Sequence, residues 1–308
     1  MVKKTLLTLL SWLAGIAAMV GLFIYYRPQG FWNAVDTIGV IGIAGWTLLT
    51  LGGRVTANEA TVVPLAALGF RMTRADAFWI SWIRTFVNQI TPLAGAAAYV
   101  HMVRRHTGIN WSQVAALGQP QIILVATGIG IVGLAAVAVN LPRLGASALG
   151  LAGIYGILVV ATLAIASGTH WLLEALPERA AERVIGTSSA MRTMAKSPKL
   201  MLTLLAYHTL STILRGARVW FLFDATGVTL GWAELLLVLA ITESSLLLNI
   251  TPGALGVREG AILAGAGLIG IPAATASAVA LIDRIFMVAL TSVLAVPSVL
   301  ILRKPKEA

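Results

Sequence analysis

The fold of this chain is decided at Asn249-Ile250-Thr251-Pro252-Gly253-Ala254-Leu255-Gly256, and again at the similar stretch Asn88-Gln89-Ile90-Thr91-Pro92-Leu93-Ala94-Gly95. The first stretch interrupts the apolar segment 233–268, and the second interrupts the apolar segment 77–103. Proline removes a backbone hydrogen-bond donor and clashes with the preceding helical turn, and glycine adds backbone freedom at the same place. The sequence therefore predicts two helical segments, each broken at this point.

The composition around these stretches is typical of a membrane protein. The chain has 308 residues, of which 58% are hydrophobic and only 11% are charged. Its mean hydropathy is +0.89, whereas a soluble domain carries about 25% charged residues. One membrane span needs roughly 20 apolar residues. Besides the two broken segments, the sequence has six apolar stretches of suitable length, at 5–26, 37–57, 112–140, 147–167, 200–223 and 273–302.

The two breaks also belong to a longer internal repeat. Residues 69–76 precede the first break and resemble residues 227–234, which precede the second. The Gly-Ile pair at 108–109 recurs after the second break at 270–271. The spacing is close to 160 residues throughout, with small insertions and deletions. Because matches in the same order at a similar spacing indicate a duplication, we expect the chain to consist of two related halves.

The distribution of lysine and arginine distinguishes two membrane topologies. If all eight apolar segments crossed the membrane, each side would hold eight cationic residues from loops and termini. If both broken segments return to the side they enter from, the N-terminal side holds fourteen and the other side holds two, Arg27 and Arg143. Cytoplasmic loops carry an excess of lysine and arginine, so the sequence predicts the second topology.

The predicted fold is therefore an all-α, polytopic membrane protein with a single transmembrane domain, 1–308. It has six full spans plus two re-entrant broken helical hairpins, in two inverted repeats, 1–145 and 146–308. The polar segment 168–199 is expected to be a cytoplasmic connector. Both termini are expected on the cytoplasmic side of a cell membrane, which we take to be a bacterial inner membrane. Paired Gly/Pro-broken segments in inverted repeats indicate the midplane binding site of a transporter.

Several classes of function find no support in the sequence. The net charge of +10 comes without a basic run longer than two residues, so nucleic-acid binding is not expected. Cysteine is absent, no histidine has a partner at metal-ligand spacing, and no phosphate-binding loop of the ATPase type is present. We expect no metal, no cofactor and no catalytic residues, and hence a protein that is not an enzyme.

Charged residues within the apolar segments are the candidates for a site. Ionisable groups at membrane depth are unfavourable unless they face a cavity or a partner. Four acidic residues lie there, Glu59, Glu243, Glu259 and Asp283. The basic residues are six arginines, Arg54, Arg84, Arg215, Arg218, Arg258 and Arg284. Because guanidinium groups bind phosphate through two parallel hydrogen bonds, this excess of arginine predicts an anionic ligand.

Position in the broken segments singles out some of these residues. Arg258 follows the second break, where the N-terminus of a half-helix adds positive potential, so it is expected to bind an anion. The alternative is that Arg258 only pairs with Glu259 or Asp283.

Arg84 and Glu243 occupy equivalent places before the two breaks. They either form an ion pair or gate across the two halves, or reach separate membrane interfaces. Asp283 and Arg284 are expected to form a local pair in the last span. Arg54, Arg215 and Arg218 are expected to reach a membrane interface.

The second break carries a family resemblance. The stretch Asn249 to Gly260, with its Pro-x-x-x-Gly-x-Arg-Glu-Gly pattern, resembles the flippase-like family of the lysylphosphatidylglycerol synthase transmembrane region. The continuation through residues 270–271 to Leu281-Ile282-Asp283-Arg284 is similar as well. The first half departs from the family pattern, because Gln119-Pro120-Gln121 stands where an arginine is expected.

The resemblance implies a protein that moves lipids or lipid-linked sugars between leaflets. Together with the breaks, it predicts that the substrate is bound by Arg84, Asn88, Thr91, Pro92, Glu243, Asn249, Thr251, Pro252, Gly256, Arg258, Glu259 and Arg284. The expected partners are membrane lipids with an anionic headgroup, and possible protein partners are a glycosyltransferase or a lipid-modifying enzyme.

Two alternatives remain open at this point. One is a membrane-embedded transferase that modifies lipid and uses His208 or Glu259 as its base. The other is a non-transporting membrane partner of a glycosyltransferase.

Overall fold

The computed structural model describes residues 20, 21, 24, 31–67, 69–91, 94–109, 111–167, 197–247 and 251–303, and every regular element within these ranges is a helix. The predicted all-α class is thus confirmed for the described part of the chain. Most of the predicted first span, 5–26, and nearly all of the predicted connector, 168–199, lie outside the described residues.

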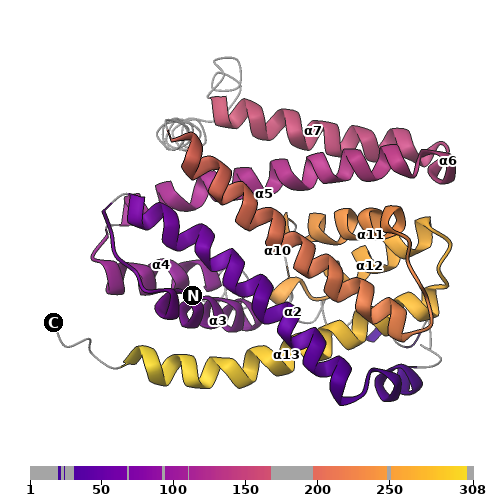
Figure 1. The fold of residues 1–308 in the computed structure, drawn as a ribbon, viewed down its shortest axis with the longest axis horizontal. Coiled ribbons are helices and arrows are strands. Elements are labelled where there is room, and N and C mark those ends of the chain that lie inside the picture. Colours follow the sequence, from indigo (N-terminus) through magenta and orange to yellow (C-terminus); the bar gives the residue numbers. More distant parts are fainter. Residues whose placement is uncertain are drawn as a thin grey trace, which may run out of the picture.

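The helices follow the predicted apolar segments closely (Figure 1). They are α2 (Phe31–Ala67), α3 (Arg74–Ile90), α4 (Ala94–Thr107), α5 (Trp111–Val139), α6 (Leu141–Leu144), α7 (Ser147–Ser167), α10 (Pro198–Ala225), α11 (Trp232–Ser244), α12 (Val257–Leu268) and α13 (Ala273–Arg303). Two short 3-10 helices, η1 (Ser245–Leu247) and η2 (Pro252–Ala254), lie between α11 and α12.

Both predicted helix breaks are confirmed. Helix α3 ends at Ile90 and α4 begins at Ala94, while α11 ends at Ser244 and α12 begins at Val257. Around the second break Gly253 and Gly256 have φ values of 58° and 80°, which glycine adopts without strain. Two predicted site residues at the breaks, Pro92 and Asn249, lie outside the described residues.

In each broken segment the two helical arms pack against each other, α3 on α4 and α11 on α12. Glycine permits this close approach. A Cβ atom added to Gly95 would lie 2.3 Å from the carbonyl oxygen of Arg84, and one added to Gly265 would lie 3.1 Å from Cα of Val238. Small residues at such contacts let helix backbones approach closely in a membrane.

Four described helical segments are long and apolar enough to cross a membrane, namely Val35–Ala67, Gln121–Val139, Ser147–Ile165 and Ala273–Leu302. They coincide with four of the six predicted spans. Helix α10 covers a fifth predicted span with 28 residues, although its polar side chains make it less apolar. Large apolar side chains such as Ile41 (89% exposed) and Leu149 (82% exposed) cover the outer faces. These features make the chain a membrane protein with transmembrane helices.

The helices pack in a reciprocal pattern. Helix α3 packs on α13, and α11 packs on α5, so the broken segment of each half contacts the last long helix of the other half. Helices α2 and α10 lie side by side through the middle of the molecule, and α5 and α7 form a pair at the top of Figure 1. This arrangement leaves a space bounded by α2, α3, α10 and α13 next to the second break.

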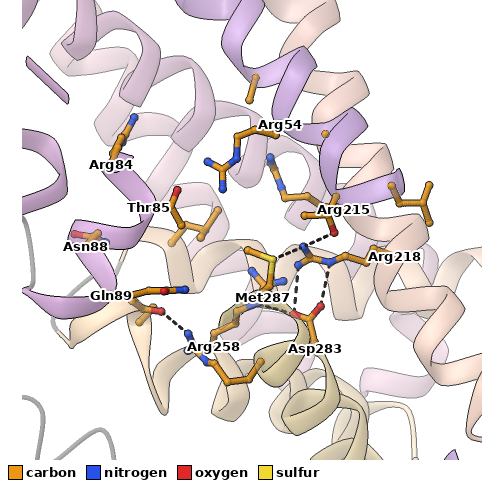
Figure 2. Close-up of a pocket in the computed structure, with 18 residues that line it drawn as sticks. Arg54, Arg84, Thr85, Asn88, Gln89, Arg215, Arg218, Arg258, Asp283 and Met287 are labelled. Atoms are coloured by element: carbon orange, nitrogen blue, oxygen red, sulfur yellow. Dashed lines mark hydrogen bonds and ion pairs between the residues drawn. The ribbon is translucent and has the colours of Figure 1, made fainter. Parts of the chain in front are cut away.

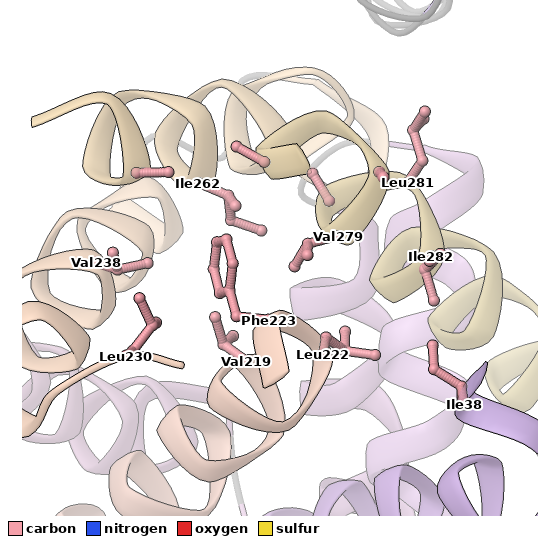
Figure 3. Close-up of a cluster of buried hydrophobic side chains, with 14 of the residues drawn as sticks. Ile38, Val219, Leu222, Phe223, Leu230, Val238, Ile262, Val279, Leu281 and Ile282 are labelled. Atoms are coloured by element: carbon pink, nitrogen blue, oxygen red, sulfur yellow. The ribbon is translucent and has the colours of Figure 1, made fainter. Parts of the chain in front are cut away.

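A buried cluster fixes the second broken segment beside this space. Phe223 from α10, Val238 from α11, Ile262 from α12 and Val279 from α13 all belong to it (Figure 3). Phe223 and Val279 are fully buried, and burying a large apolar side chain stabilises the fold by about 1.5–3 kcal/mol. The cluster therefore holds α12 and the N-terminal third of α13 in a defined position relative to α10.

Candidate functional site

A cavity of about 440 Å³ lies among α2, α3, α10, α13 and the second break. Its lining includes all six of the arginines that the sequence places in or near the apolar segments. They are Arg54 from α2, Arg84 from α3, Arg215 and Arg218 from α10, Arg258 from α12 and Arg284 from α13 (Figure 2). Among the described residues, Asp283 is the one acidic residue in the lining. Guanidinium groups from five helices thus converge on a single space.

Asp283 is the centre of the largest ion-pair network. Its carboxylate lies 3.0 Å from Nε of Arg218 and 3.3 Å from Nε of Arg258. The indole N–H of Trp46 donates a hydrogen bond to the same carboxylate at 3.1 Å. Asp283 is only 2% exposed, and the network joins α2, α10, α12 and α13. Arg258 therefore pairs with Asp283 and also lines the cavity, so anion binding by Arg258 stays a prediction.

The expected local pair of Asp283 with Arg284 is wrong. Arg284 instead lies 2.5 Å from Glu259, and its Nη1 donates to the carbonyl oxygen of Gly253 at 2.9 Å. Glu259 also accepts a hydrogen bond from the backbone N–H of Gly256 at 2.7 Å. These contacts connect α13 to the irregular backbone between η2 and α12, and they cap the N-terminus of α12.

The proposed pairing of Arg84 with Glu243 is also wrong. Glu243 accepts a hydrogen bond from Arg215 at 2.7 Å, and Arg215 also donates to the hydroxyls of Ser211 and Thr212. Arg84 lies over the ring of Tyr99, with its guanidinium carbon 5.1 Å from the ring centre. Residues at equivalent places in two halves therefore need not meet, because each finds a closer partner on a neighbouring helix.

Arg54, Arg215 and Arg218 were expected at a membrane interface, but they line the cavity. The guanidinium carbon of Arg54 lies 4.8 Å from the centre of the Trp82 ring. Arg218 is 5.2 Å from the centre of the Trp46 ring in addition to its pair with Asp283.

The charges of the site do not balance. Six guanidinium groups are opposed by three carboxylates, those of Asp283, Glu243 and Glu259, so the cluster carries a net charge of +3. No group of three potential metal ligands exists within the described part of the chain. Because arginine has no acceptor and does not bind cations, the arrangement suits an anion.

The predicted site residues separate into two groups. Arg84, Asn88, Arg258 and Arg284 line the cavity. The other predicted residues that the structure describes lie next to the cavity-lining residues or in the second break. Glu243 and Glu259 form ion pairs with cavity arginines, and the backbone N–H of Gly256 donates a hydrogen bond to Glu259. The Thr251 hydroxyl donates a hydrogen bond to the Leu255 carbonyl, and Pro252 is buried. Thr91 is the C-cap of α3.

Some lining residues were missing from the predicted site. Arg54, Arg215, Arg218 and Asp283 gave a signal, since charge at membrane depth already marked them. The sequence signal for Thr85 and Gln89 was weaker. These two residues lie four positions apart on α3, as do their neighbours Arg84 and Asn88. Residues four apart share one face of a helix, so the periodicity around Arg84 indicated the whole face.

Comparisons with known proteins gave one match. A family model described as the lysylphosphatidylglycerol synthase TM region matches residues 8–295. Neither the curated proteins nor the solved structures gave a match. The family match covers both broken segments and all six cavity arginines.

Proposed function

The chain belongs to the family of the lysylphosphatidylglycerol synthase TM region, and from this membership and the cationic cavity we propose that it moves an anionic lipid or lipid-linked saccharide between membrane leaflets. The family is a membrane domain of lipid-related proteins. The proposed activity is transport of such a lipid across the membrane, without ATP hydrolysis by this chain.

The observation that carries the proposal is the unbalanced charge of the cavity. Ionisable groups at membrane depth are unfavourable unless they face a cavity or a partner, and this cluster keeps a net charge of +3. An anionic headgroup supplies the missing negative charge, and its tails would stay in the bilayer. A cavity lined by irregular backbone at Gly253 and Ala254 is also the place where non-helical structure is tolerated in a membrane.

We also propose that the two halves are inverted repeats with re-entrant broken segments and cytoplasmic termini. The reciprocal packing of α3 on α13 and of α11 on α5 supports this arrangement. So does the charge distribution, which assigns fourteen cationic residues to one side and two to the other.

Cysteine labelling tests this orientation in a chain that has no native cysteine. We expect single cysteines introduced as Arg105→Cys and Ala190→Cys to react with a membrane-impermeant reagent only from the cytoplasmic side, because both segments belong to the positive side. The measurement is labelling of intact cells compared with inverted vesicles. Labelling of either position in intact cells would contradict the re-entrant topology.

The transferase alternative has less support in the site. Its two candidate bases, His208 and Glu259, do not line the cavity. Glu259 is 1% exposed, and both of its oxygens are engaged by Arg284 and Gly256. A base must reach the proton it removes, so we propose that the chain is a transporter and not an enzyme.

Transport by purified protein in lipid vesicles tests the proposed function. Lipids that co-purify with the protein are first identified by mass spectrometry, and a labelled form of the most enriched anionic lipid is then followed between leaflets. We expect Arg84→Glu to slow translocation roughly tenfold or more, because it replaces an attractive charge by a repulsive one. Arg84 is exposed, so the variant is expected to fold.

Arg71→Glu is the matched control, because Arg71 is exposed and lies outside the cavity. It changes the net charge of the protein by the same amount and is expected to transport normally. Wild-type protein that moves lipid no faster than protein-free vesicles would refute transport. Normal transport by Arg84→Glu would instead show that Arg84 does not contribute to translocation.

A further inference from the structure

Arg54 and Arg84 differ from the other four cavity arginines in how they are held. Arg215, Arg218, Arg258 and Arg284 each form an ion pair with a carboxylate. Within the described ranges, neither Arg54 nor Arg84 has an ion pair or a hydrogen bond from its side chain, and Figure 2 shows no dashed line to either. Both therefore keep a full set of unused donors at the cavity.

Aromatic rings position these two arginines. The guanidinium carbon of Arg54 lies over the Trp82 ring, and that of Arg84 lies over the Tyr99 ring. Both rings are fixed, since Trp82 is fully buried and the Tyr99 hydroxyl hydrogen-bonds to Thr61 at 3.0 Å. A cation–π contact with a ring uses none of the guanidinium N–H donors in a conventional hydrogen bond, so they stay free for an oxygen acceptor. The rings thus orient the donors without neutralising their charge.

Arg54 has other arginines as neighbours in the cavity lining. The positive charges of Arg84, Arg215 and Arg218 all act on it. Repulsion between these like charges is unfavourable. An anion that binds between Arg54 and its neighbours removes the repulsion and stabilises the protein by linkage.

We propose that Arg54 and Arg84 bind the phosphate of the lipid headgroup, and that the cavity selects headgroups with at least two negative charges. Lipid phosphomonoesters and diphosphates have this chemistry. The identification of the ligand as a lipid rests on the proposed function.

The charge balance carries the inference about headgroup charge. The four paired arginines are opposed by three carboxylates, so most of the net charge of +3 belongs to Arg54 and Arg84. A phosphodiester brings one negative charge and leaves most of this excess in place. A dianionic headgroup neutralises both arginines, and a terminal phosphate has three free oxygens with which to reach two guanidinium groups.

Binding of two short-chain lipids to the full-length protein in detergent tests the inference. Dihexanoylphosphatidic acid and dihexanoylphosphatidylglycerol have identical tails. At pH 8 the first is a dianion, because the second pKa of a phosphomonoester is about 6, and the second lipid is a monoanion. We expect wild-type protein to bind the phosphatidic acid roughly tenfold more tightly, as one additional charge-assisted contact provides.

The variants identify the arginines responsible. Arg54→Ala and Arg84→Ala are each expected to weaken binding of the phosphatidic acid roughly tenfold to hundredfold, and to bring the affinities for the two lipids together. Arg71→Ala, outside the cavity, is expected to leave both affinities unchanged. Because neither cavity arginine has an ion pair to lose, the thermal midpoints of Arg54→Ala and Arg84→Ala should equal or exceed that of the wild type.

Each outcome bears on a different statement. If the wild type binds the two lipids with equal affinity, the proposed selectivity for dianionic headgroups is wrong. This comparison uses the wild-type protein alone. Wild-type affinity in both arginine variants overturns the assignment of the phosphate ligands. A parallel translocation assay with the same headgroups separates this inference from transport itself. If neither of these lipids nor the enriched co-purified lipid moves, the proposed function is refuted, whereas equal movement of both headgroups refutes only the selectivity.

Discussion

Replacing Asp283 by asparagine is expected to lower the free energy of unfolding by about 3–5 kcal/mol, the range for breaking a buried ion pair by removal of one partner. The carboxylate serves the buried guanidinium group of Arg218 and the largely buried one of Arg258, and it accepts a hydrogen bond from Trp46. Asparagine has nearly the same shape, so little packing is lost. What changes is that two positive charges remain buried without their counter-charge.

Unfolding in mixed detergent micelles, followed by circular dichroism, measures this loss. The matched control is Arg143→Gln, which removes one partner of the exposed ion pair between Arg143 and Glu234. Exposed pairs contribute about 0–1 kcal/mol, so the control should remain close to wild type. If Asp283→Asn were as stable as this control, Asp283 would not be the structural centre of the cavity.

The main features of the fold were predictable from local chemistry. Proline and glycine act on the backbone next to them, so the breaks near Pro92 and Pro252 could be placed to within a few residues. The cavity arginines were also identifiable, because a guanidinium group in an apolar segment requires a special environment wherever the helix lies. The membrane orientation and the inverted relation of the two halves stay predictions.

The ion pairs were not predictable, because they join residues that are distant in sequence. Trp46 and Asp283 are 237 positions apart, and Arg218 and Asp283 are 65 apart. Asp283 and Arg284 are adjacent, but successive residues of a helix point about 100° apart, so neighbours reach different partners. Asp283 turns toward α10 and α12, whereas Arg284 turns toward Glu259 and the second break.

The lack of an ion pair at Arg54 and Arg84 was likewise not predictable from the sequence. It depends on the position of Trp82 and Tyr99, two aromatic residues that sequence reasoning treats as interface anchors or core. Stacking on a ring leaves no pattern of charge in the sequence. A positive residue that lacks a carboxylate can therefore be recognised only when its three-dimensional neighbours are known.

Replacing Glu259 by glutamine is expected to destabilise the second break, again by about 3–5 kcal/mol. Glu259 is 1% exposed, and it accepts hydrogen bonds from both Arg284 and the backbone N–H of Gly256. A glutamine side chain has one carbonyl oxygen and one amide group, so it cannot serve both donors with two oxygens. Arg284 then loses its counter-charge, and its contact with the Gly253 carbonyl no longer fixes the irregular backbone.

Glu234→Gln is a closely matched control for this variant. Glu234 occupies the same position in α11, where it caps the N–H of Gly231 at 2.8 Å and pairs with Arg143. The two glutamates differ in burial, since the side chain of Glu234 is 21% exposed and that of Glu259 is 2% exposed. Solvent screens the exposed pair, so Glu234→Gln should cost about 1 kcal/mol or less. Equal losses in the two variants would mean that capping, not the buried charge of Arg284, determines the effect, and that the cavity side of α12 needs no ion pair to keep its shape.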